Sequence, residues 1–236
     1  MNLLIVHPND FISENMVSIS GPRLHHIRNI LKTDIDQSLA MGILNGSIGT
    51  GILASRNESR DLFQVQFSSP PPPALNVTLI LALPRPKVFR RILQSITSLG
   101  VKHIILLHAF RVEKSYWQSP FLSDTSIFTQ CIKGLEQAKD TMVPFIQMEK
   151  KFKPFVEDQL PLLLKDKKGY IAHPYCESSF GNPEPPAVVA IGPEGGFIPY
   201  EVQLLEKAGM QSFSMGARIL TTETAASVLL SRFLPF

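Results

Sequence analysis

Two glycine-containing turns in the C-terminal third of the chain hold the residues whose types and spacing could bind a ligand. The first is Gly192-Pro193-Glu194-Gly195-Gly196, after the apolar run 187–191, and the second is Gly216-Ala217-Arg218, after the alternating run 211–215. Glycine lets the backbone approach a ligand closely because it has no side chain. Ligands of open α/β sheets bind at the carboxyl ends of strands. We therefore interpret the turns as a binding site, although the first could equally be a plain strand-to-helix connection.

Charged residues flank the apolar pair Ile219-Leu220 that follows the second turn. Arg218 could bind a carboxylate or a phosphate. Glu223 could be there because an acidic residue is favourable in the first turn of a helix, with Thr221 or Thr222 as the cap. The sequence contains no phosphate-binding loop, dinucleotide fingerprint, Ser/His/Asp set, zinc signature or paired-carboxylate spacing. Hydrolytic chemistry therefore has little support.

Alternating strand and helix patterns over residues 74–236 would position these turns. We expect strands near 76–83, 103–108, 144–148, 169–173, 187–191 and 211–215. We expect helices near 86–99, 121–139, 152–165, 199–208 and 222–234, with Pro161 ending or kinking the third. Such alternation predicts an α/β fold with a mostly parallel sheet covered on both faces.

The N-terminal part has a different pattern. We expect a strand over 3–7, a helix from Pro22 to about Leu31 capped by Ser20, and strands near 38–44, 48–54 and 62–68, with Asn45-Gly46 as a hairpin turn. These elements predict a small β-rich domain over 1–69. Four prolines at 70–73 predict a stiff linker to a second domain over 74–236.

Composition indicates an ordinary globular protein, with 44% hydrophobic and 18% charged residues. Its apolar runs are shorter than a membrane span needs, and the N-terminus lacks the regions of a secretion signal, so we expect a cytoplasmic protein without a membrane partner. Cys131 and Cys176 fit neither a metal-ligand spacing nor a disulfide framework. Residues 1–73 carry five Lys/Arg and six Asp/Glu, and residues 74–236 carry eighteen and fourteen, so any polyanion would meet the second part first.

Two linked motifs resemble the signature of the RsmE family. They are Ile191-Gly192-Pro193-Glu194-Gly195-Gly196-Phe197 and Gly216-x-Arg218-Ile219-Leu220-x-Thr222-Glu223-Thr224-Ala225. The similarity extends along the chain to Glu136-Gln137, Val143-Pro144 and His173-Pro174. It also includes His26-Ile27 with Ile30-Leu31 and the Asn45-Gly46 hairpin, which resemble the family's PUA-like RNA-binding domain.

The resemblance implies an enzyme that uses S-adenosylmethionine to methylate N3 of a uridine in small-subunit (16S) ribosomal RNA. It implies a C-terminal SPOUT-type α/β domain with a trefoil knot, preceded by a small β-rich PUA-like domain, in a homodimer that needs no metal. The residues that the family would use for the cofactor share the turns after three strands; here they are His173, Ile191, Gly192, Pro193, Glu194, Gly195, Gly196, Met215, Gly216, Ile219, Leu220 and Thr224.

Catalysis at uracil N3 requires removal of a proton, because the protonated nitrogen is a poor nucleophile. A general base or stabilisation of the developing anion is needed. The resemblance makes Arg218 the candidate anion stabiliser and Glu223 the acid–base candidate.

The cations that could bind RNA phosphates form three groups in the sequence. They are Arg23, Arg28 and Lys32; Arg85, Lys87, Arg90 and Arg91; and Arg111 and Lys114. The first group could instead be a solvated helix face. Tyr116 and Trp117 could stack an unpaired base, although Trp117 could also pack against its own domain.

Three positions depart from the family pattern. Glu136-Gln137 is followed by Ala138-Lys139-Asp140 without the usual arginine, Leu220 is followed by Thr221 instead of arginine, and Ile198-Pro199 replaces a polar helix cap. Two alternatives stay open: a non-catalytic RNA-binding member of the fold, and a methyltransferase with a different RNA target.

Overall fold

The computed structural model describes residues 2–235. The chain divides into two compact units: an N-terminal unit of Met1–Pro73 with Ile132–Val143, and a C-terminal unit of Ala74–Cys131 with Pro144–Phe236. The chain first passes from the N-terminal unit to the C-terminal unit after the four prolines at 70–73, which form neither helix nor strand. The segment 132–143 was not part of the predicted N-terminal domain.

The N-terminal unit is built on a six-stranded sheet with the order β1-β4-β5-β6-β3-β2. Only β1 and β4 pair in parallel. The strands are β1 (Leu4–Val6), β2 (Phe11–Ser13), β3 (Met16–Ser20), β4 (Ser38–Ile43), β5 (Ile48–Arg56) and β6 (Arg60–Ser69). The hairpin between β4 and β5 confirms the Asn45-Gly46 prediction, and Asn45 adopts a positive φ of 57°.

Two sequence predictions for this unit were incomplete or wrong. Strands β2 and β3 were not predicted, although Val17 and Ile19 alternate in burial with their neighbours. Ser20 ends β3 and does not cap the helix, because Gly21 occupies the N-cap position. The helix itself runs as α1 (Pro22–His25) and a π-helical turn η2 (His26–Ile30), and its Leu24 and Ile27 join the core with Val17, Phe63 and others.

The segment 132–143 completes the N-terminal unit. Leu135, near the end of α3 (Asp124–Ala138), packs in a fully buried cluster with Leu3 and Ile5. The carbonyl of Glu136 accepts hydrogen bonds of 3.0 Å from the backbone N–H groups of Asn2 and Leu3. The end of a helix that begins in the C-terminal unit is therefore part of the N-terminal core.

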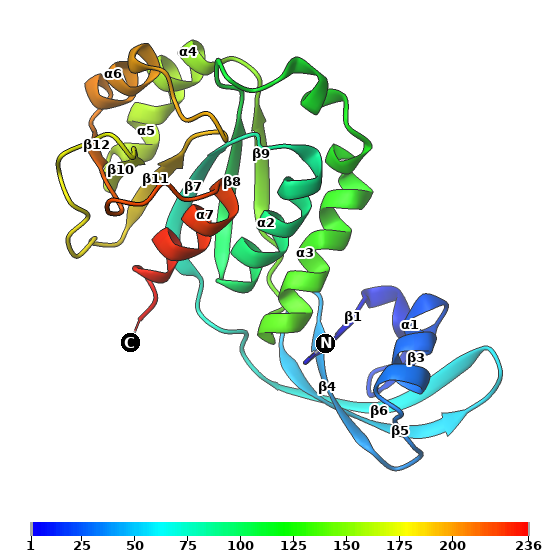
Figure 1. The fold of residues 1–236 in the computed structure, drawn as a ribbon. Helices are drawn as coiled ribbons and strands as arrows, with labels where there is room; N and C mark the ends of the chain where they lie inside the picture. Colours follow the sequence, from blue (N-terminus) through cyan, green and yellow to red (C-terminus); the bar gives the residue numbers. More distant parts are fainter. Residues whose placement is uncertain (1, 236) are drawn as a thin grey trace. The chain divides into compact units, whose positions relative to one another are not determined.

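The C-terminal unit contains a six-stranded, fully parallel sheet with the order β12-β10-β11-β7-β8-β9 (Figure 1). The strands are β7 (Leu75–Ala82), β8 (Val101–Leu107), β9 (Phe145–Glu149), β10 (Lys168–Ala172), β11 (Ala187–Ile191) and β12 (Met210–Phe213). All five residues of the central strand β11 are buried. This burial requires cover on both faces, as the sequence predicted.

The helices of this unit are α2 (Pro86–Ser98), α3, α6 (Pro199–Lys207), α7 (Thr222–Ser231) and a broken helix over 152–164. Helix α7 packs against β11 and beside α2. The broken helix consists of α4 (Phe152–Pro154), a π-helical turn η5 (Phe155–Gln159) and α5 (Leu160–Leu164). Pro161 lies at the start of α5, which confirms the predicted interruption. Helix α3 agrees with the helix predicted near 121–139, and two short 3-10 helices that were not predicted, η3 (Lys114–Gln118) and η4 (Pro120–Leu122), precede it.

The carboxyl ends of β10, β11 and β12 lie next to one another. Ala172, the last residue of β10, is paired with Ile191 of β11 on one side and with Phe213 of β12 on the other. The turns that follow these strands therefore start from one edge of the sheet. The two glycine turns of the sequence follow β11 and β12, and the segment after His173 follows β10.

Candidate functional site

A cavity that is partly open to solvent lies at this edge of the sheet. Its lining comes from the three connections after β10, β11 and β12 and from the start of α7: Ala172, His173, Pro174, Tyr175, Ile191, Gly192, Pro193, Glu194, Gly195, Gly196, Phe197, Met215, Gly216, Arg218, Ile219, Leu220, Thr222 and Ala225.

Backbone conformation at two glycines keeps this cavity open. Gly196 has a φ of 73° and Gly216 a φ of 114°, a region that residues with a Cβ rarely adopt. A Cβ built on either glycine meets no atom within 4 Å. The space beside both residues is therefore open, and a ligand could approach their backbone closely.

The structure brings together every predicted cofactor residue except Thr224. The backbone N–H of Thr224 donates a 3.3 Å hydrogen bond to Oγ1 of Thr221, which is the N-cap of α7. Thr224 thus fixes the start of α7 and does not line the cavity. Thr221, where the family usually has arginine, is itself the N-cap of α7.

Of the two predicted catalytic residues, only Arg218 lines the cavity, and its side chain is exposed. Glu223 lies outside the lining and forms an ion pair with Arg91 of α2, at 2.8 Å between Oε2 and Nη2. The hydrogen bonds from Arg91 lower the pKa of Glu223 below its ordinary value. A carboxylate held in this way is a weaker base, so the geometry favours a role for Glu223 in fixing α7 against α2.

Two carboxylates hold the glycine turn and the helix after it. Oε1 of Glu194 accepts a 3.0 Å hydrogen bond from the backbone N–H of Arg85. Glu201, which is 3% exposed, accepts bonds from the N–H groups of Phe110 at 2.7 Å and Ile198 at 3.0 Å. Glu201 therefore caps α6 in place of the missing polar residue at 198. This role was not predicted, although the position of Glu201 at N3 after Ile198-Pro199 is a local signal for it.

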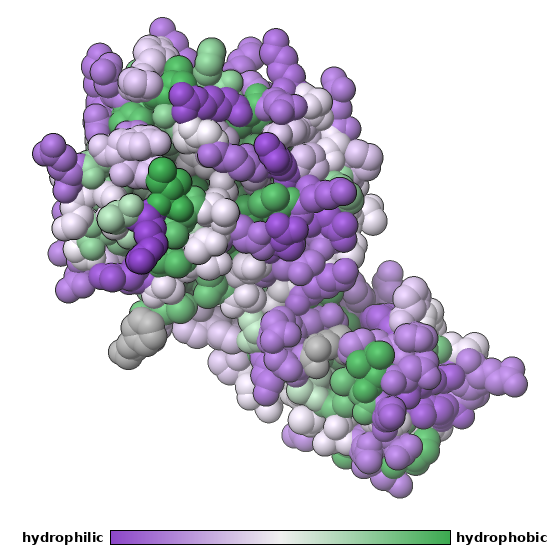
Figure 2. Space-filling view, viewed as in Figure 1, coloured by the Kyte–Doolittle hydropathy of each residue, from purple (hydrophilic) through white to green (hydrophobic). Residues whose placement is uncertain are grey.

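Exposed cations follow the neighbouring strands β7 and β8. Arg85 and Lys87 follow β7, and Arg111 and Lys114 follow β8; all four side chains are exposed. Arg111 donates a hydrogen bond through Nη1 to the carbonyl oxygen of Gly195, so one of these cations contacts the turn that lines the cavity. Hydrophilic side chains gather over α2 and α3 in Figure 2.

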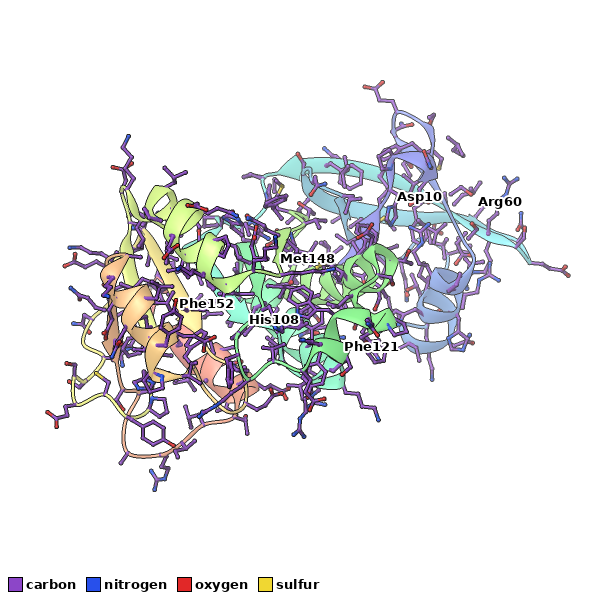
Figure 3. All side chains as sticks on the ribbon, turned by 90° about the horizontal axis from the view of Figure 1, so that it is seen from above. Asp10, Arg60, His108, Phe121, Met148 and Phe152 are labelled. Carbon is purple, nitrogen blue, oxygen red and sulfur yellow. The ribbon has the colours of Figure 1, made fainter. Side chains whose placement is uncertain are left out.

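Arg90 differs from the other predicted RNA-binding cations of the C-terminal unit. Its side chain is half-buried, and its guanidinium carbon lies 4.9 Å from the centre of the Phe121 ring. Arg90 therefore packs against η4. Phe121 is labelled in Figure 3, as is His108.

Trp117 packs within its own unit. Its Nε1–H donates a 2.9 Å hydrogen bond to Nδ1 of His108, and Nζ of Lys150 lies 5.7 Å from its ring centre. Burial lowers the pKa of His108, which favours the neutral imidazole that can accept this bond. The packing interpretation of Trp117 thus agrees with the structure better than the base-stacking one.

The cations of the first predicted group lie in the N-terminal unit, and two of them have internal partners. Arg23 forms a bidentate pair with Asp10, at 2.6 and 2.7 Å. Arg28 binds Asp61, whose carboxylate is fully buried, at 2.6 Å. Lys32 is exposed and ends the helix with a φ of 52°. Arg23 and Arg28 therefore hold the fold together and do not form a solvated helix face.

Among residues 2–235, no group of three or more His, Cys, Asp or Glu residues is placed to hold a metal ion. None of the helices formed by these residues is both long and apolar enough to span a membrane.

The parallel sheet with a cavity at its carboxyl edge defines an α/β domain with a candidate ligand site, and exposed cations lie on the connections beside it. The chain belongs to the RNA methyltransferase domain family, whose model matches residues 71–234.

Two relatives of this chain are named as ribosomal RNA small subunit methyltransferases. The ribosomal RNA small subunit methyltransferase E of Treponema pallidum is 28% identical over 236 residues, which covers 96% of this chain and 88% of the relative. The ribosomal RNA small subunit methyltransferase E 1 of Borreliella burgdorferi is 26% identical over 232 residues, which covers 95% and 94%. These matches confirm the resemblance to the RsmE family.

Solved structures show the same fold at lower identity. A methyltransferase from Legionella pneumophila, in complex with the cofactor SAM, superposes with a TM-score of 0.76 at 20% identity, covering 98% of this chain and 96% of that one. The ribosomal RNA small subunit methyltransferase E of Neisseria gonorrhoeae, bound to S-adenosyl methionine, gives a TM-score of 0.72 at 20% identity, covering 98% and 95%.

Proposed function

We propose that this chain is an S-adenosylmethionine-dependent methyltransferase that acts on N3 of a uridine in small-subunit ribosomal RNA. The observation that carries the proposal is the cavity formed by the connections after β10, β11 and β12, with Arg218 in its wall, inside an RNA methyltransferase domain. The relatives that carry the name ribosomal RNA small subunit methyltransferase E support the substrate class.

The cavity residues fit S-adenosylmethionine by their chemistry. Apolar side chains such as Ile191 and Leu220 suit an adenine ring, and the open space beside Gly196 and Gly216 suits backbone contacts to a nucleoside. When bound, this cofactor supplies a methyl group that its sulfonium already activates. The contribution of the protein is then mainly to hold the reacting groups in line.

Arg218 would stabilise the uracil anion that forms when N3 loses its proton. A guanidinium stays charged at any physiological pH, so it favours the anion without gaining or losing a proton. Glu223, paired with Arg91, would act as a positioning residue that keeps the start of α7 and the preceding Arg218 segment in place.

We infer that the fold has the finer features of the SPOUT superfamily. The segment after β12 pairs with the connection between β10 and β11: the N–H of Ser214 donates to the carbonyl of Ser178 at 2.8 Å, and the N–H of Phe180 donates to Ser214 at 3.1 Å. The chain then continues to α7, which packs on β11. This path supports a knot in which the C-terminal segment passes through the β10–β11 connection.

We also propose a PUA-like role for the N-terminal unit, a homodimer and a cytoplasmic location.

The non-catalytic alternative was motivated by missing family arginines at positions 140 and 221. Both residues have roles in the fold: Oδ1 of Asp140 accepts a 2.9 Å bond from the N–H of Met142, and Thr221 caps α7. Neither change removes Arg218 from the cavity, so the catalytic proposal is better supported.

The reaction can be tested with small ribosomal subunits from cells that lack their own uridine-N3 methyltransferase. The subunits, or the naked RNA, are incubated with the chain and S-adenosylmethionine, and the nucleosides are analysed by mass spectrometry. We expect 3-methyluridine to appear. A different methylated nucleoside would indicate another target. If the chain binds RNA but calorimetry detects no binding of S-adenosylmethionine, the protein is a non-catalytic scaffold.

A further inference from the structure

Phe110 is an exposed aromatic residue at the carboxyl edge of the parallel sheet. It follows β8 by three residues, and 76% of its surface is exposed. A single exposed apolar side chain needs no special explanation by itself. The backbone N–H of Phe110 and the side chain of the next residue, however, tie this position to the turn that lines the cavity and to the helix after it.

Two tethers fix the position of Phe110. Its backbone N–H donates the 2.7 Å hydrogen bond to Glu201, and the buried Glu201 carboxylate also caps the helix after the glycine turn. The next residue, Arg111, donates through its guanidinium to the carbonyl of Gly195 within that turn. The ring is therefore held close to the cavity while it faces solvent.

The cations around Phe110 indicate which kind of molecule could bind over its ring. Arg111 and Lys114 follow Phe110 on the same connection, and Arg85 follows the neighbouring strand β7. An exposed aromatic ring among cations suits a single-stranded nucleic acid, whose bases stack on the ring while its phosphates pair with the cations. Trp117, the other candidate for stacking, is engaged with His108.

We propose that Phe110 is the stacking platform for a base of the RNA substrate beside the methyl-transfer cavity. This inference rests on the proposed function and adds a specificity-determining residue to it. The platform holds the unpaired segment of RNA that enters the cavity, while Arg111 both supports the glycine turn and meets the phosphate of the stacked nucleotide.

The test compares Phe110→Ala with Phe110→Trp in the full-length chain. Because the tether uses the backbone N–H of residue 110, both variants keep the bond to Glu201. We expect Phe110→Ala to lower kcat/KM for undermethylated small subunits by about 5- to 150-fold, mainly through KM, which is the effect of removing one base–aromatic stack. Phe110→Trp should retain activity, and both should bind S-adenosylmethionine like the wild type in calorimetry.

Phe145→Ala is the matched control. Phe145 is the first residue of β9, at the opposite edge of the same sheet, and is 65% exposed. Its loss should leave kcat/KM for RNA unchanged. An equal effect of Phe110→Ala and Phe145→Ala, or no effect of Phe110→Ala, would overturn the proposal.

A fluorescence measurement tests the stack directly. The chain has one tryptophan, so Phe110→Trp in a Trp117→Phe background places the only indole at position 110. Added subunits should quench its emission, and unchanged emission would contradict stacking.

Two further outcomes are distinguishable. If Phe110→Ala changes the oligomeric state in sedimentation while RNA affinity is unaffected, the ring serves an interface with another copy, and the stacking proposal is wrong. If the wild-type chain produces no 3-methyluridine, the proposed function is wrong; activity of the wild type with an equally active Phe110→Ala variant rejects only this inference.

Discussion

Arg218 combines two features that a group acting on the substrate needs. It lines the cavity, and its side chain is exposed to solvent. Glu223 shares neither feature, because it is paired with Arg91 outside the lining. Five residues apart in the sequence, the two side chains therefore have different surroundings and, we infer, different roles.

The first prediction concerns Arg218→Ala. We expect kcat to fall by about 10²- to 10³-fold, as when one group that stabilises a developing anion is removed. The affinity for S-adenosylmethionine should change little, because the proposed contacts of the cofactor come from the turns. Single-turnover kinetics and calorimetry check the two quantities, and an equal loss in both would assign Arg218 to cofactor binding.

At the level of elements, the site depends on backbone conformation more than on side-chain chemistry. Gly196 and Gly216 adopt positive φ values where the connections after β11 and β12 meet the cavity. Arg111 donates a hydrogen bond to the first of these turns, and Glu201 caps the helix that follows it. The turn is therefore held in shape before any ligand binds.

Gly196→Ala tests this dependence. The new Cβ would be strained by the positive φ and would enter the open space of the cavity, so we expect the affinity for S-adenosylmethionine to fall by about tenfold or more, which is about 1.4 kcal/mol. The control is Gly209→Ala, which has a comparable φ of 106° but lies outside the cavity lining. If both variants lose the same affinity in calorimetry, strain alone explains the effect.

A buried carboxylate clamps three elements of the N-terminal unit. Asp61 of β6 accepts hydrogen bonds from Arg28 of the helix and from Arg56 of β5. Burial raises the pKa of Asp61, but these bonds more than offset it and leave the pKa below the ordinary value. A depressed folded-state pKa contributes stability above the unfolded-state pKa of about 4, and this stability is lost as pH falls through the folded value.

We therefore expect Asp61→Asn to destabilise the N-terminal unit by about 3 kcal/mol near neutral pH, with a smaller penalty in strong acid. Hydrogen exchange of β5 and β6 measures this unit separately. The control is Glu58→Gln, which changes an exposed carboxylate in the turn between β5 and β6 and should have little effect. Equal exchange in the two variants at neutral pH would contradict the clamp.

The sequence predicted the parts of the fold that repeat a simple pattern. The six parallel strands were predicted because apolar runs that alternate with helical patterns are a strong signal, and the two glycine turns follow two of these runs directly. The bonds from Phe110 to Glu201 and from Arg111 to Gly195 were not predicted, since they depend on how distant segments meet. The same reason explains why Glu223 was given a catalytic role: its partner, Arg91, is 132 residues away.

At the scale of the whole molecule, the two units share one helix. The beginning of α3 belongs to the C-terminal unit, and its last turns belong to the N-terminal unit through Leu135 and the carbonyl of Glu136. A division at the proline linker alone therefore leaves part of the N-terminal core on the second fragment.

Removal of residues 1–69 should expose the segment 132–143. Without Leu3 and Ile5, Leu135 loses its buried neighbours, so we expect faster hydrogen exchange over 132–143 and a lower Tm for the remaining chain. RNA affinity should also fall if the N-terminal unit binds RNA. Exchange over 132–143 that matches the intact chain would show that α3 holds its end without this cover.

The central claim is that the turns after β10, β11 and β12 form the site of the methyl donor. A crystal structure of the chain grown with S-adenosylmethionine tests it most directly. We predict the adenosine between the 191–197 and 215–220 segments, with the methyl group facing the side of Arg218. A cofactor bound at another place, or a cavity closed by its own lining side chains, would contradict the account.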